Sequence, residues 1–281
     1  MSESAPRADL TGWRRAAFTD AEVTHDVYEK GHGPGVVLLS EIPGITPQVL
    51  ALGDHLVEQG FTVAIPSLFG TPGRSASPGY AIGTVARLCI SAEFRAFATK
   101  ARRPIADYVR ALARDLNART PGSGVGVIGM CFTGGFALAA AADESVIAPV
   151  LSQPALPFPT SRARRRDAGV SAGELAAVAD RVAGSGLCVL GLRFSHDRGC
   201  PGDRFAALRA RLGDGFEVIE LNSGPGNPDG FSKNAHSVLT AEVRERAENS
   251  AFAARARVVQ FLRERLAGHE SSGDRAAAEN S

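Results

Sequence analysis

Short apolar runs and amphipathic stretches alternate along the chain. Continuous runs of about four to eight apolar residues are typical of buried strands, and apolar residues that recur every three or four positions are typical of helices. The runs predict strands at 36–40, 61–65, 125–128, 146–151, 187–194 and 216–221. The helical patterns predict helices at 47–59, 103–119, 136–142, 171–182 and 250–266, and a further helix from Pro201 onward.

Local residue types mark several boundaries of these elements. Pro47 suits the first turn of a helix, and Gly60 suits its C-terminal end. The run Ser171-Ala172-Gly173-Glu174 has the pattern of a capping box, which opens a helix. The stretch 71–83 is rich in Gly, Pro and Ser, so we predict a loop there.

Strands that alternate with helices indicate a mostly parallel sheet. Such a sheet needs helices on both faces, because its strands are apolar on both sides. No internal repeat divides the chain, so we predict a single α/β domain over residues 13–267. The polar ends, residues 1–12 and 268–281, are predicted to be disordered.

Composition narrows the class of protein. Hydrophobic residues make up 44% of the chain and the net charge is +1, so no strong field favours nucleic acid or an anionic membrane. The cluster Arg162, Arg164, Arg165 and Arg166 is predicted to be a solvated loop. No apolar run is long enough to span a membrane, and the N-terminus lacks the pattern of a signal peptide. We expect a cytoplasmic protein without a nucleic-acid or membrane partner.

One cysteine stands in a distinctive context. Cys131 lies in the run Gly129-Met130-Cys131-Phe132-Thr133-Gly134-Gly135, between a predicted strand and a predicted helix. A strand, a tight turn and a helix with the reactive residue at the apex form the nucleophile elbow of α/β-hydrolases, here with sulfur in place of the serine oxygen. Flanking glycines suit a strained turn, and the N-terminus of the following helix favours a thiolate.

The other cysteines fit a simpler interpretation. Free cysteines are usually small buried hydrophobes, and we expect this of Cys89, Cys188 and Cys200. The four cysteines contain no C-x-x-C pair, so neither a zinc site nor a disulfide framework is predicted, and no cofactor is expected. A cysteine that works as a thiolate also suits a reducing compartment.

Candidate partners for the thiol follow the predicted strands, because ligands bind at the carboxyl ends of strands in such sheets. Glu41, Asp197 and His236 each come after a strand. The order nucleophile, acid, histidine is that of α/β-hydrolases. His196 competes with His236 for the role of base, and Asp203 and Asp229 compete with Asp197 for the role of acid.

Five segments resemble the dienelactone hydrolase family, and the resemblance as a whole covers residues from about 36 to 262. They are 40–44 (SEIPG), 60–68 (GFTVAIPSL), 129–135 (GMCFTGG), 197–201 (DRGCP) and 235–237 (AHS). The elbow is specific for the α/β-hydrolase superfamily. The glutamate after the first apolar strand, together with cysteine at the elbow, is more specific for this family.

The resemblance implies an α/β-hydrolase fold and a carboxylic ester hydrolase. It implies a triad of Cys131, Asp197 and His236 that forms a thioester acyl-enzyme with a small ester or lactone. Glu41 would hold the resting thiol and take its proton when substrate enters. The oxyanion hole would use the backbone N–H groups of Ile42 and Phe132.

The chain departs from the family pattern where substrate is bound. A substrate-binding Arg is expected four residues after the histidine, but Thr240 stands there. A second carboxylate-binding Arg is expected before the 103–119 helix, where Arg87 and Arg95 are the candidates. The long loop 222–230 before His236 is expected to reshape the pocket mouth. The sequence therefore favours hydrolase chemistry more strongly than a dienelactone substrate.

Three other interpretations remain open at this stage. A class I glutamine amidotransferase-like protein also places cysteine in a Gly-rich elbow, but it usually carries Glu two residues after its histidine, where this chain has Val238. A redox-sensing protein would use a Cys–Glu pair and would not need Asp197 or His236. A non-enzymatic binding protein on a hydrolase scaffold would not need the triad. For any of these, the sequence leaves monomer and homodimer equally open.

Overall fold

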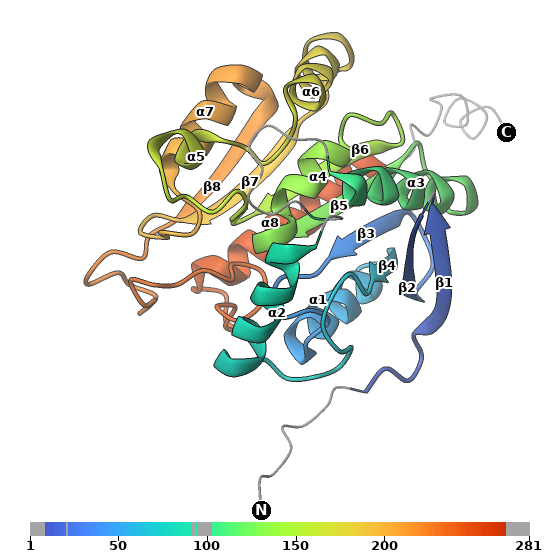
Figure 1. The fold of residues 1–281 in the computed structure, drawn as a ribbon, viewed down its shortest axis with the longest axis horizontal. Coiled ribbons are helices and arrows are strands. Elements are labelled where there is room, and N and C mark those ends of the chain that lie inside the picture. Colours follow the sequence, from blue (N-terminus) through green and yellow to red (C-terminus); the bar gives the residue numbers. More distant parts are fainter. Residues whose placement is uncertain (1–8, 21, 92–93, 95–102, 268–281) are drawn as a thin grey trace, which may run out of the picture.

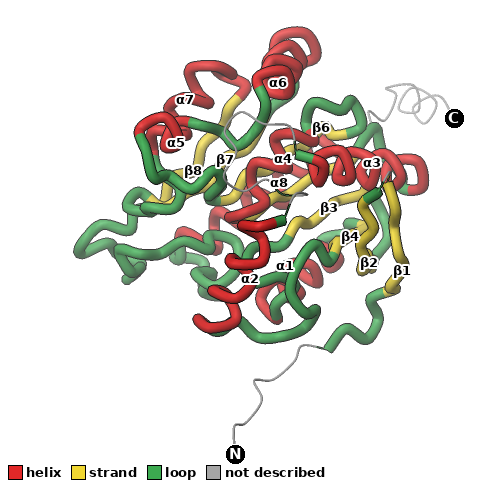
Figure 2. Tube along the Cα trace, viewed as in Figure 1, coloured by secondary structure: helices red, strands yellow, loops and turns green. Residues whose placement is uncertain are grey.

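A central sheet with helices on both faces forms the core of the protein (Figures 1 and 2). The computed structural model describes residues 9–20, 22–91, 94 and 103–267. Eight strands of this part form one sheet in the order β1-β2-β4-β3-β5-β6-β7-β8. They are β1 (Arg14–Asp20), β2 (Val23–Lys30), β3 (Gly35–Leu39), β4 (Thr62–Pro66), β5 (Val125–Met130), β6 (Val146–Ser152), β7 (Val189–Phe194) and β8 (Phe216–Leu221).

The direction of the strands divides the sheet into two parts. β1 pairs with β2, and β2 with β4, in antiparallel fashion, whereas the six strands from β4 to β8 are parallel. The carboxyl ends of β3, β5, β6, β7 and β8 therefore meet at one edge of the sheet. The α/β-hydrolase architecture predicted from the sequence, with a mostly parallel sheet, is confirmed.

Side chains that alternate along the strands feed two separate hydrophobic layers. Val37 and Leu39 point to the face that α3, α4, α6 and α7 cover, and Val36 and Leu38 point to the face that α1 and α8 cover. The helices are α1 (Pro47–Glu58), α2 (Pro78–Ile90), α3 (Pro104–Arg119), α4 (Gly134–Ala140), α5 (Arg162–Arg166), α6 (Ala172–Ser185), α7 (Gly202–Leu212) and α8 (Ser250–Leu266). No helix of the described part combines the length and apolar character needed to cross a membrane.

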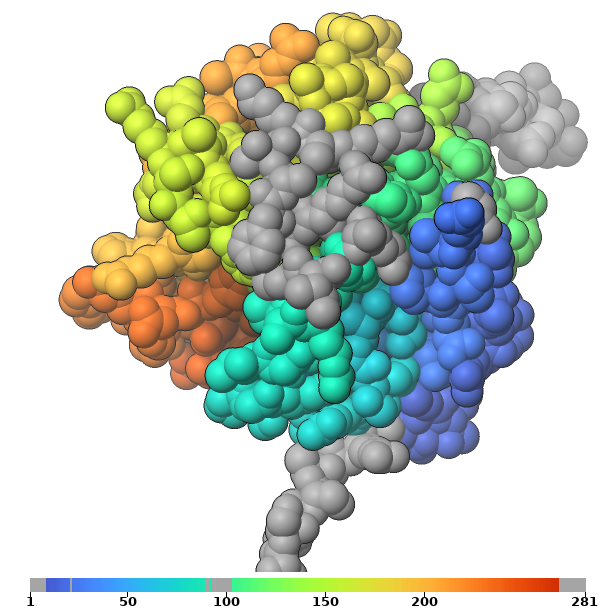
Figure 3. Space-filling model, viewed as in Figure 1, coloured from blue at the N-terminus to red at the C-terminus, as the bar shows by residue number. Residues whose placement is uncertain are grey.

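The structure corrects the predicted loop at 71–83, because α2 begins inside it at Pro78. Ser77 is the N-cap of α2, its side chain accepts a hydrogen bond from the backbone of Tyr80, and Pro78 occupies the first turn. The helix lies at the surface (Figure 3), and Ile82 is 70% exposed. Ser-Pro is thus a helix start here, although the composition around it resembles a loop.

Two further differences concern exposed elements. β1 and β2 were not predicted because neither strand carries a continuous apolar run. β1 is mostly exposed, and most residues of β2 are only half-buried. The arginine cluster is solvated as predicted, but 162–166 forms the short helix α5 with Ser161 as its N-cap. The predicted tail 268–281 and residues 1–8 of the predicted N-terminal segment lie outside the described residues, so the predicted domain limits stay predictions.

Candidate active site

Cys131 lies directly after β5, at the start of a single 3-10 turn (Cys131–Thr133) that leads into α4. Its φ angle is +52°, a left-handed conformation that is strained for a residue with a side chain. The neighbouring glycines allow this turn. A Cβ on Gly129 would lie 2.5 Å from the carbonyl oxygen of Thr133, and one on Gly134 would lie 2.6 Å from Cβ of Pro154.

Thr133 fixes the turn, and this role was not predicted from the sequence. Its fully buried hydroxyl accepts a hydrogen bond from the backbone N–H of Met130 at 2.9 Å. The same oxygen lies 2.9 Å from the carbonyl of Met130 and 3.2 Å from those of Leu39 and Ser40, to which its single hydrogen can be donated. In the usual elbow pattern, G-x-S-x-G, a glycine stands here, so the threonine was the available signal. It connects the elbow to the end of β3.

His236 lies between Cys131 and Asp197. Its Nδ1 is 2.6 Å from Oδ2 of Asp197, and the side chain of Cys131 lies close enough to the ring to influence its pKa. Asp197 is 6% exposed, and its other oxygen accepts backbone N–H groups from Gly199 at 2.8 Å and Cys200 at 3.2 Å. The carboxylate, the imidazole and the sulfur therefore lie together in the order that a catalytic triad requires.

The pKa values of His236 and Asp197 reflect these contacts. Burial alone would lower the pKa of His236, but the charge of Cys131 and the hydrogen bond to Asp197 outweigh it and raise that pKa well above its usual value. Burial would raise the pKa of Asp197, but the hydrogen bond and charge of His236, with the two backbone N–H groups, lower it overall. The arrangement thus favours a protonated imidazole beside the carboxylate of Asp197.

Glycine at position 199 leaves room for this pair. A Cβ there would lie 3.3 Å from Oδ1 of Asp197 and 3.4 Å from Cε1 of His236, which is closer than almost all real Cβ contacts. The sequence analysis identified the whole Asp197–Pro201 segment as a family motif. It did not predict that Gly199 would lie against the imidazole of His236.

Within the described part of the chain, Glu41 forms no hydrogen bond with the thiol of Cys131. Its buried carboxylate accepts hydrogen bonds from Ser237 Oγ at 2.8 Å, from Gln153 Nε2 at 3.2 Å and from Thr240 Oγ1. Thr240, predicted at the place of a substrate-binding arginine, thus contacts the glutamate. All three donors are neutral, and no described cation forms a salt bridge with this carboxylate.

The remaining predicted residues fall into three groups. The backbone donors Ile42 and Phe132 follow β3 and the apex cysteine, with Ile42 half-buried and the Phe132 side chain buried. Arg87 is exposed on α2, and Arg95 lies outside the described residues. Of the other cysteines, Cys200 is fully buried, which raises the pKa of its thiol. Cys188 is half-buried, and the side chain of Cys89 is outside the described part.

The competing acids and base have other partners. The ring of His196 lies 3.0 Å from Ser195 Oγ. Asp203 forms an ion pair with Arg165 at 2.6 Å, and Asp229 accepts hydrogen bonds from Ser250 at the start of α8. None of the three forms a hydrogen bond with Cys131 or His236 within the described part of the chain.

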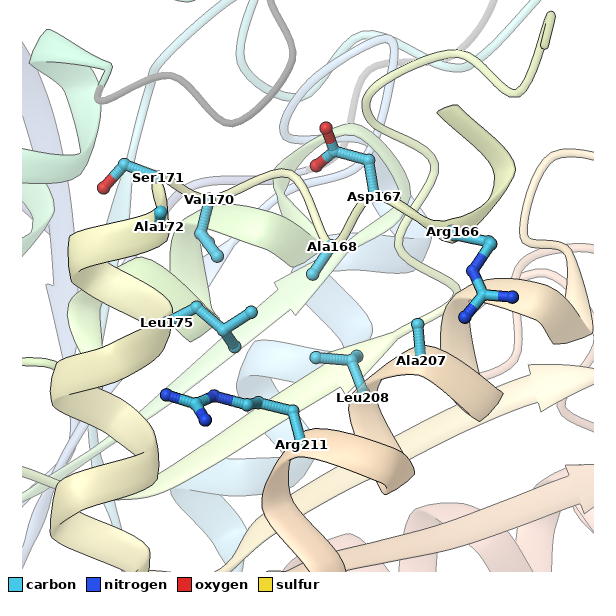
Figure 4. Close-up of a pocket in the computed structure, with 10 residues that line it drawn as sticks. All are labelled: Arg166, Asp167, Ala168, Val170, Ser171, Ala172, Leu175, Ala207, Leu208 and Arg211. Carbon is cyan, nitrogen blue, oxygen red and sulfur yellow. The ribbon is translucent and has the colours of Figure 1, made fainter. Parts of the chain in front are cut away.

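A cavity of about 300 Å³ lies away from these groups, between α6 and α7 (Figure 4). Its floor includes Leu175 and Leu208, and Arg166 and Arg211 border it. None of the candidate catalytic residues lines this cavity, so it is not the site of the predicted reaction. The described residues also contain no cluster of three or more His, Cys, Asp or Glu side chains that would hold a metal ion.

Known proteins resemble both the sequence and the fold. The chain is 31% identical over 118 residues to a carboxymethylenebutenolidase of Rhodococcus opacus, a match that spans 42% of each chain. The crystal structure of a putative dienelactone hydrolase from Klebsiella pneumoniae has a TM-score of 0.59 at 16% identity. A dienelactone hydrolase-like promiscuous phosphotriesterase from metagenomic libraries has the same TM-score at 18% identity. Each of these structures covers 89% of this chain and is itself covered to 97%.

The family model for dienelactone hydrolases matches residues 23–190, which is more than half of the chain. The match includes Glu41 and Cys131 and ends before Asp197 and His236. The structural likenesses, all below a quarter in sequence identity, describe the fold alone. The family match, which covers more than half of the chain, shows that this chain belongs to the dienelactone hydrolase family.

Proposed function

We propose that this protein hydrolyses small esters or lactones through a thioester formed on Cys131. The single observation that carries the proposal is the position of His236, which hydrogen-bonds Asp197 and lies beside Cys131, the residue at the apex of a strained elbow. A cysteine is a good nucleophile once it is deprotonated, and an imidazole held by a carboxylate is the usual partner for this purpose.

The proposed reaction has two steps. The sulfur of Cys131 attacks the substrate carbonyl, and the protonated His236 gives its proton to the leaving oxygen as the C–O bond breaks. A water molecule then attacks the thioester. His236 accepts a proton from that water, the carboxylic acid leaves, and the thiolate is restored. Asp197 keeps the imidazole in the tautomer and orientation that both steps need.

Two backbone N–H groups would stabilise the oxyanion that forms in each step. That of Phe132 follows the nucleophile, and that of Ile42 lies in the segment after β3. The hydroxyl of Thr133 connects these two segments, which supports their use as a pair. Losing one such donor typically costs about a hundredfold to a thousandfold in turnover.

The same site favours an uncharged substrate in our proposal. Among the described residues, the buried carboxylate of Glu41 receives hydrogen bonds from neutral donors only, and Thr240 supplies a hydroxyl where the family pattern has an arginine. A charge-assisted hydrogen bond to a bound carboxylate is worth about 1.5–3 kcal/mol, so its loss lowers the preference for an anionic substrate by roughly ten- to a hundredfold.

The test of the chemistry is a panel of small lactones and aryl esters with wild type, Cys131→Ala and Cys188→Ala. The first substitution should abolish turnover, and the second, a control at another half-buried cysteine, should leave it unchanged. Mass spectrometry of acid-quenched wild type should find the acyl group on Cys131. Hydrolysis that survives in Cys131→Ala would contradict the proposal.

The test of the substrate class compares a dienelactone with a neutral lactone of similar size. Wild type should show the higher kcat/KM for the neutral lactone, and Thr240→Arg should narrow the difference. Thr240→Ser keeps the hydroxyl and is the control. A strong wild-type preference for the anionic lactone would contradict this part of the proposal alone.

A further inference from the structure

Two strained residues lie side by side at the carboxyl edge of the sheet. Among the described residues other than glycine, only Cys131 and Gln153 have positive φ angles, +52° and +35°. Met130 and Ser152 are paired neighbours in the parallel ladder between β5 and β6, so the two strained residues are the next residues of adjacent strands. Strain of this kind persists only where surrounding contacts enforce it, and it gathers at functional sites.

The side chain of Gln153 is fully buried and hydrogen-bonds two separate segments. Its Nε2 donates to Oε2 of Glu41 at 3.2 Å. Its Oε1 accepts the hydroxyl of Ser152 and the backbone N–H of Val238, the latter at 3.4 Å. One amide therefore connects the glutamate after β3 with the loop that carries His236.

The loop is held at the histidine and at the residues that follow it. The ring of His236 contacts Asp197, and the next residues, Ser237 and Val238, contact Glu41 and Gln153. Thr240 adds a second contact to Glu41. The position of the imidazole above the sulfur thus depends on a network that ends on one buried glutamine.

We infer that Gln153 is a positioning residue that sets the imidazole of His236 against the sulfur of Cys131. An amide suits this place because it offers a donor to the carboxylate and an acceptor to the loop N–H at once. A glutamate of the same shape would present an acceptor to Glu41 and bring two carboxyl groups together. An apolar residue would leave Glu41 and Val238 each without one buried partner. The inference rests on the proposed function.

The experiment measures alkylation of Cys131 by iodoacetamide as a function of pH, which needs no substrate. In the described part of the chain, the titratable groups considered around the sulfur are His236 from its loop, Asp197 after β7 and Glu41 after β3. Gln153→Glu should lower the alkylation rate at pH 7 by about tenfold relative to wild type, because the loop loses its alignment and the added negative charge disfavours the thiolate. On acidification the ratio of variant to wild type should rise, since a protonated glutamic acid again offers a donor to Glu41.

Three controls make the result decisive. Gln48→Glu makes the same chemical change at an exposed position of α1 and should keep the wild-type profile. Gln153→Met adds no charge, should fold if Gln153→Glu does not, and should also slow alkylation. With aryl ester substrates, both Gln153 variants should lower kcat more than they raise KM.

The possible failures are distinguishable. If Gln153→Met and Gln153→Glu are folded and keep the wild-type pH profile of alkylation, the positioning role is wrong, whatever the substrate. If Cys131 of wild type is no more reactive than Cys188, the proposed function itself fails.

Discussion

At the scale of single residues, the site depends on contacts that hold two groups in fixed positions. Cys131 is held in a left-handed turn, and His236 is held by Asp197 on one side and by its loop on the other. Neither residue type is unusual by itself. Their chemistry follows from an imidazole whose pKa is raised by the neighbouring sulfur and carboxylate despite its burial.

The histidine provides the first prediction. His236→Ala should lower turnover on the order of a thousandfold or more, because the thiol then loses its base and the leaving group its acid. His196→Ala, which removes a ring that contacts Ser195, should change turnover little. Steady-state kinetics of both variants with an aryl ester decides which histidine acts as the base. An inactive His196 variant beside an active His236 variant would reverse the assignment.

Thr133 provides a second prediction. Thr133→Val keeps the shape but leaves the backbone N–H of Met130 without its buried partner, which should cost about 1–3 kcal/mol in the free energy of unfolding. Turnover should also fall, because the elbow loses its connection to the segment that carries Ile42. Thr133→Ser keeps the hydroxyl and should stay close to wild type in urea unfolding and in kcat. Equal stability of the Val and Ser variants would show that the hydroxyl contributes nothing.

At the scale of elements, the turns between strands and helices place these residues. α4 begins three residues after Cys131 and packs so closely that Gly134 touches Pro154, in the segment after β6. That segment also donates the backbone N–H of Ala155 to the carbonyl of Cys131 at 2.8 Å. The elbow is therefore supported by the chain that follows the neighbouring strand.

A matched pair of glycine substitutions tests this packing. Gly134→Ala should destabilise the protein by about 1–3 kcal/mol, because its Cβ would lie 2.6–2.7 Å from Pro154. Gly173→Ala, in the first turn of α6 with no atom within 4 Å of its Cβ, should stabilise by about 0.4–1 kcal/mol. Thermal and urea unfolding give both values. Similar effects of the two substitutions would contradict the close contact at Gly134.

The elements differ in how far their sequence reveals them. The buried parallel strands were predicted because apolar runs such as 36–39 need no context to be recognised. β1 and α2 were not, because the first is mostly exposed and the second begins in a segment rich in Gly, Pro and Ser.

The candidate site shows the same division. Cys131 was predicted from the elbow motif, and Asp197 and His236 were predicted from strand ends, chain order and the family resemblance. Gln153 was not, because a glutamine has no meaning until the fold brings Glu41, 112 positions away, into contact with it.

At the scale of the whole molecule, the parallel sheet gathers distant parts of the chain at one edge. Glu41 and Ser237 are 196 positions apart in the chain, yet Oγ of Ser237 lies 2.8 Å from Oε2 of Glu41. Two hydrophobic layers fix the sheet from both faces, so the site on its carboxyl edge rests on rigid strands rather than on the loops alone. The stability of the fold is also linked to the protonation of His236 and Asp197, because folding shifts the pKa values of both side chains.

This linkage gives a pH dependence with a definite sign. The pKa of His236 is raised above its unfolded value of about 6.5, so protonated His236 stabilises the fold fully below pH 6.5, and this contribution disappears as pH rises through the folded pKa. The pKa of Asp197 is lowered, so its contribution is present above about pH 4 and disappears on acidification through its folded pKa. The pair should therefore stabilise the protein most between about pH 4 and 6.5.

Removal of the Cys131 sulfur separates its effect on the pKa of His236 from the effect of burial. Cys131→Ala removes the charge that raises the pKa of His236, while burial continues to lower it, so that pKa should fall in the variant. NMR titration of the His236 ring should show the lower midpoint directly. An unchanged His236 midpoint in Cys131→Ala would contradict the contribution of the sulfur to that pKa.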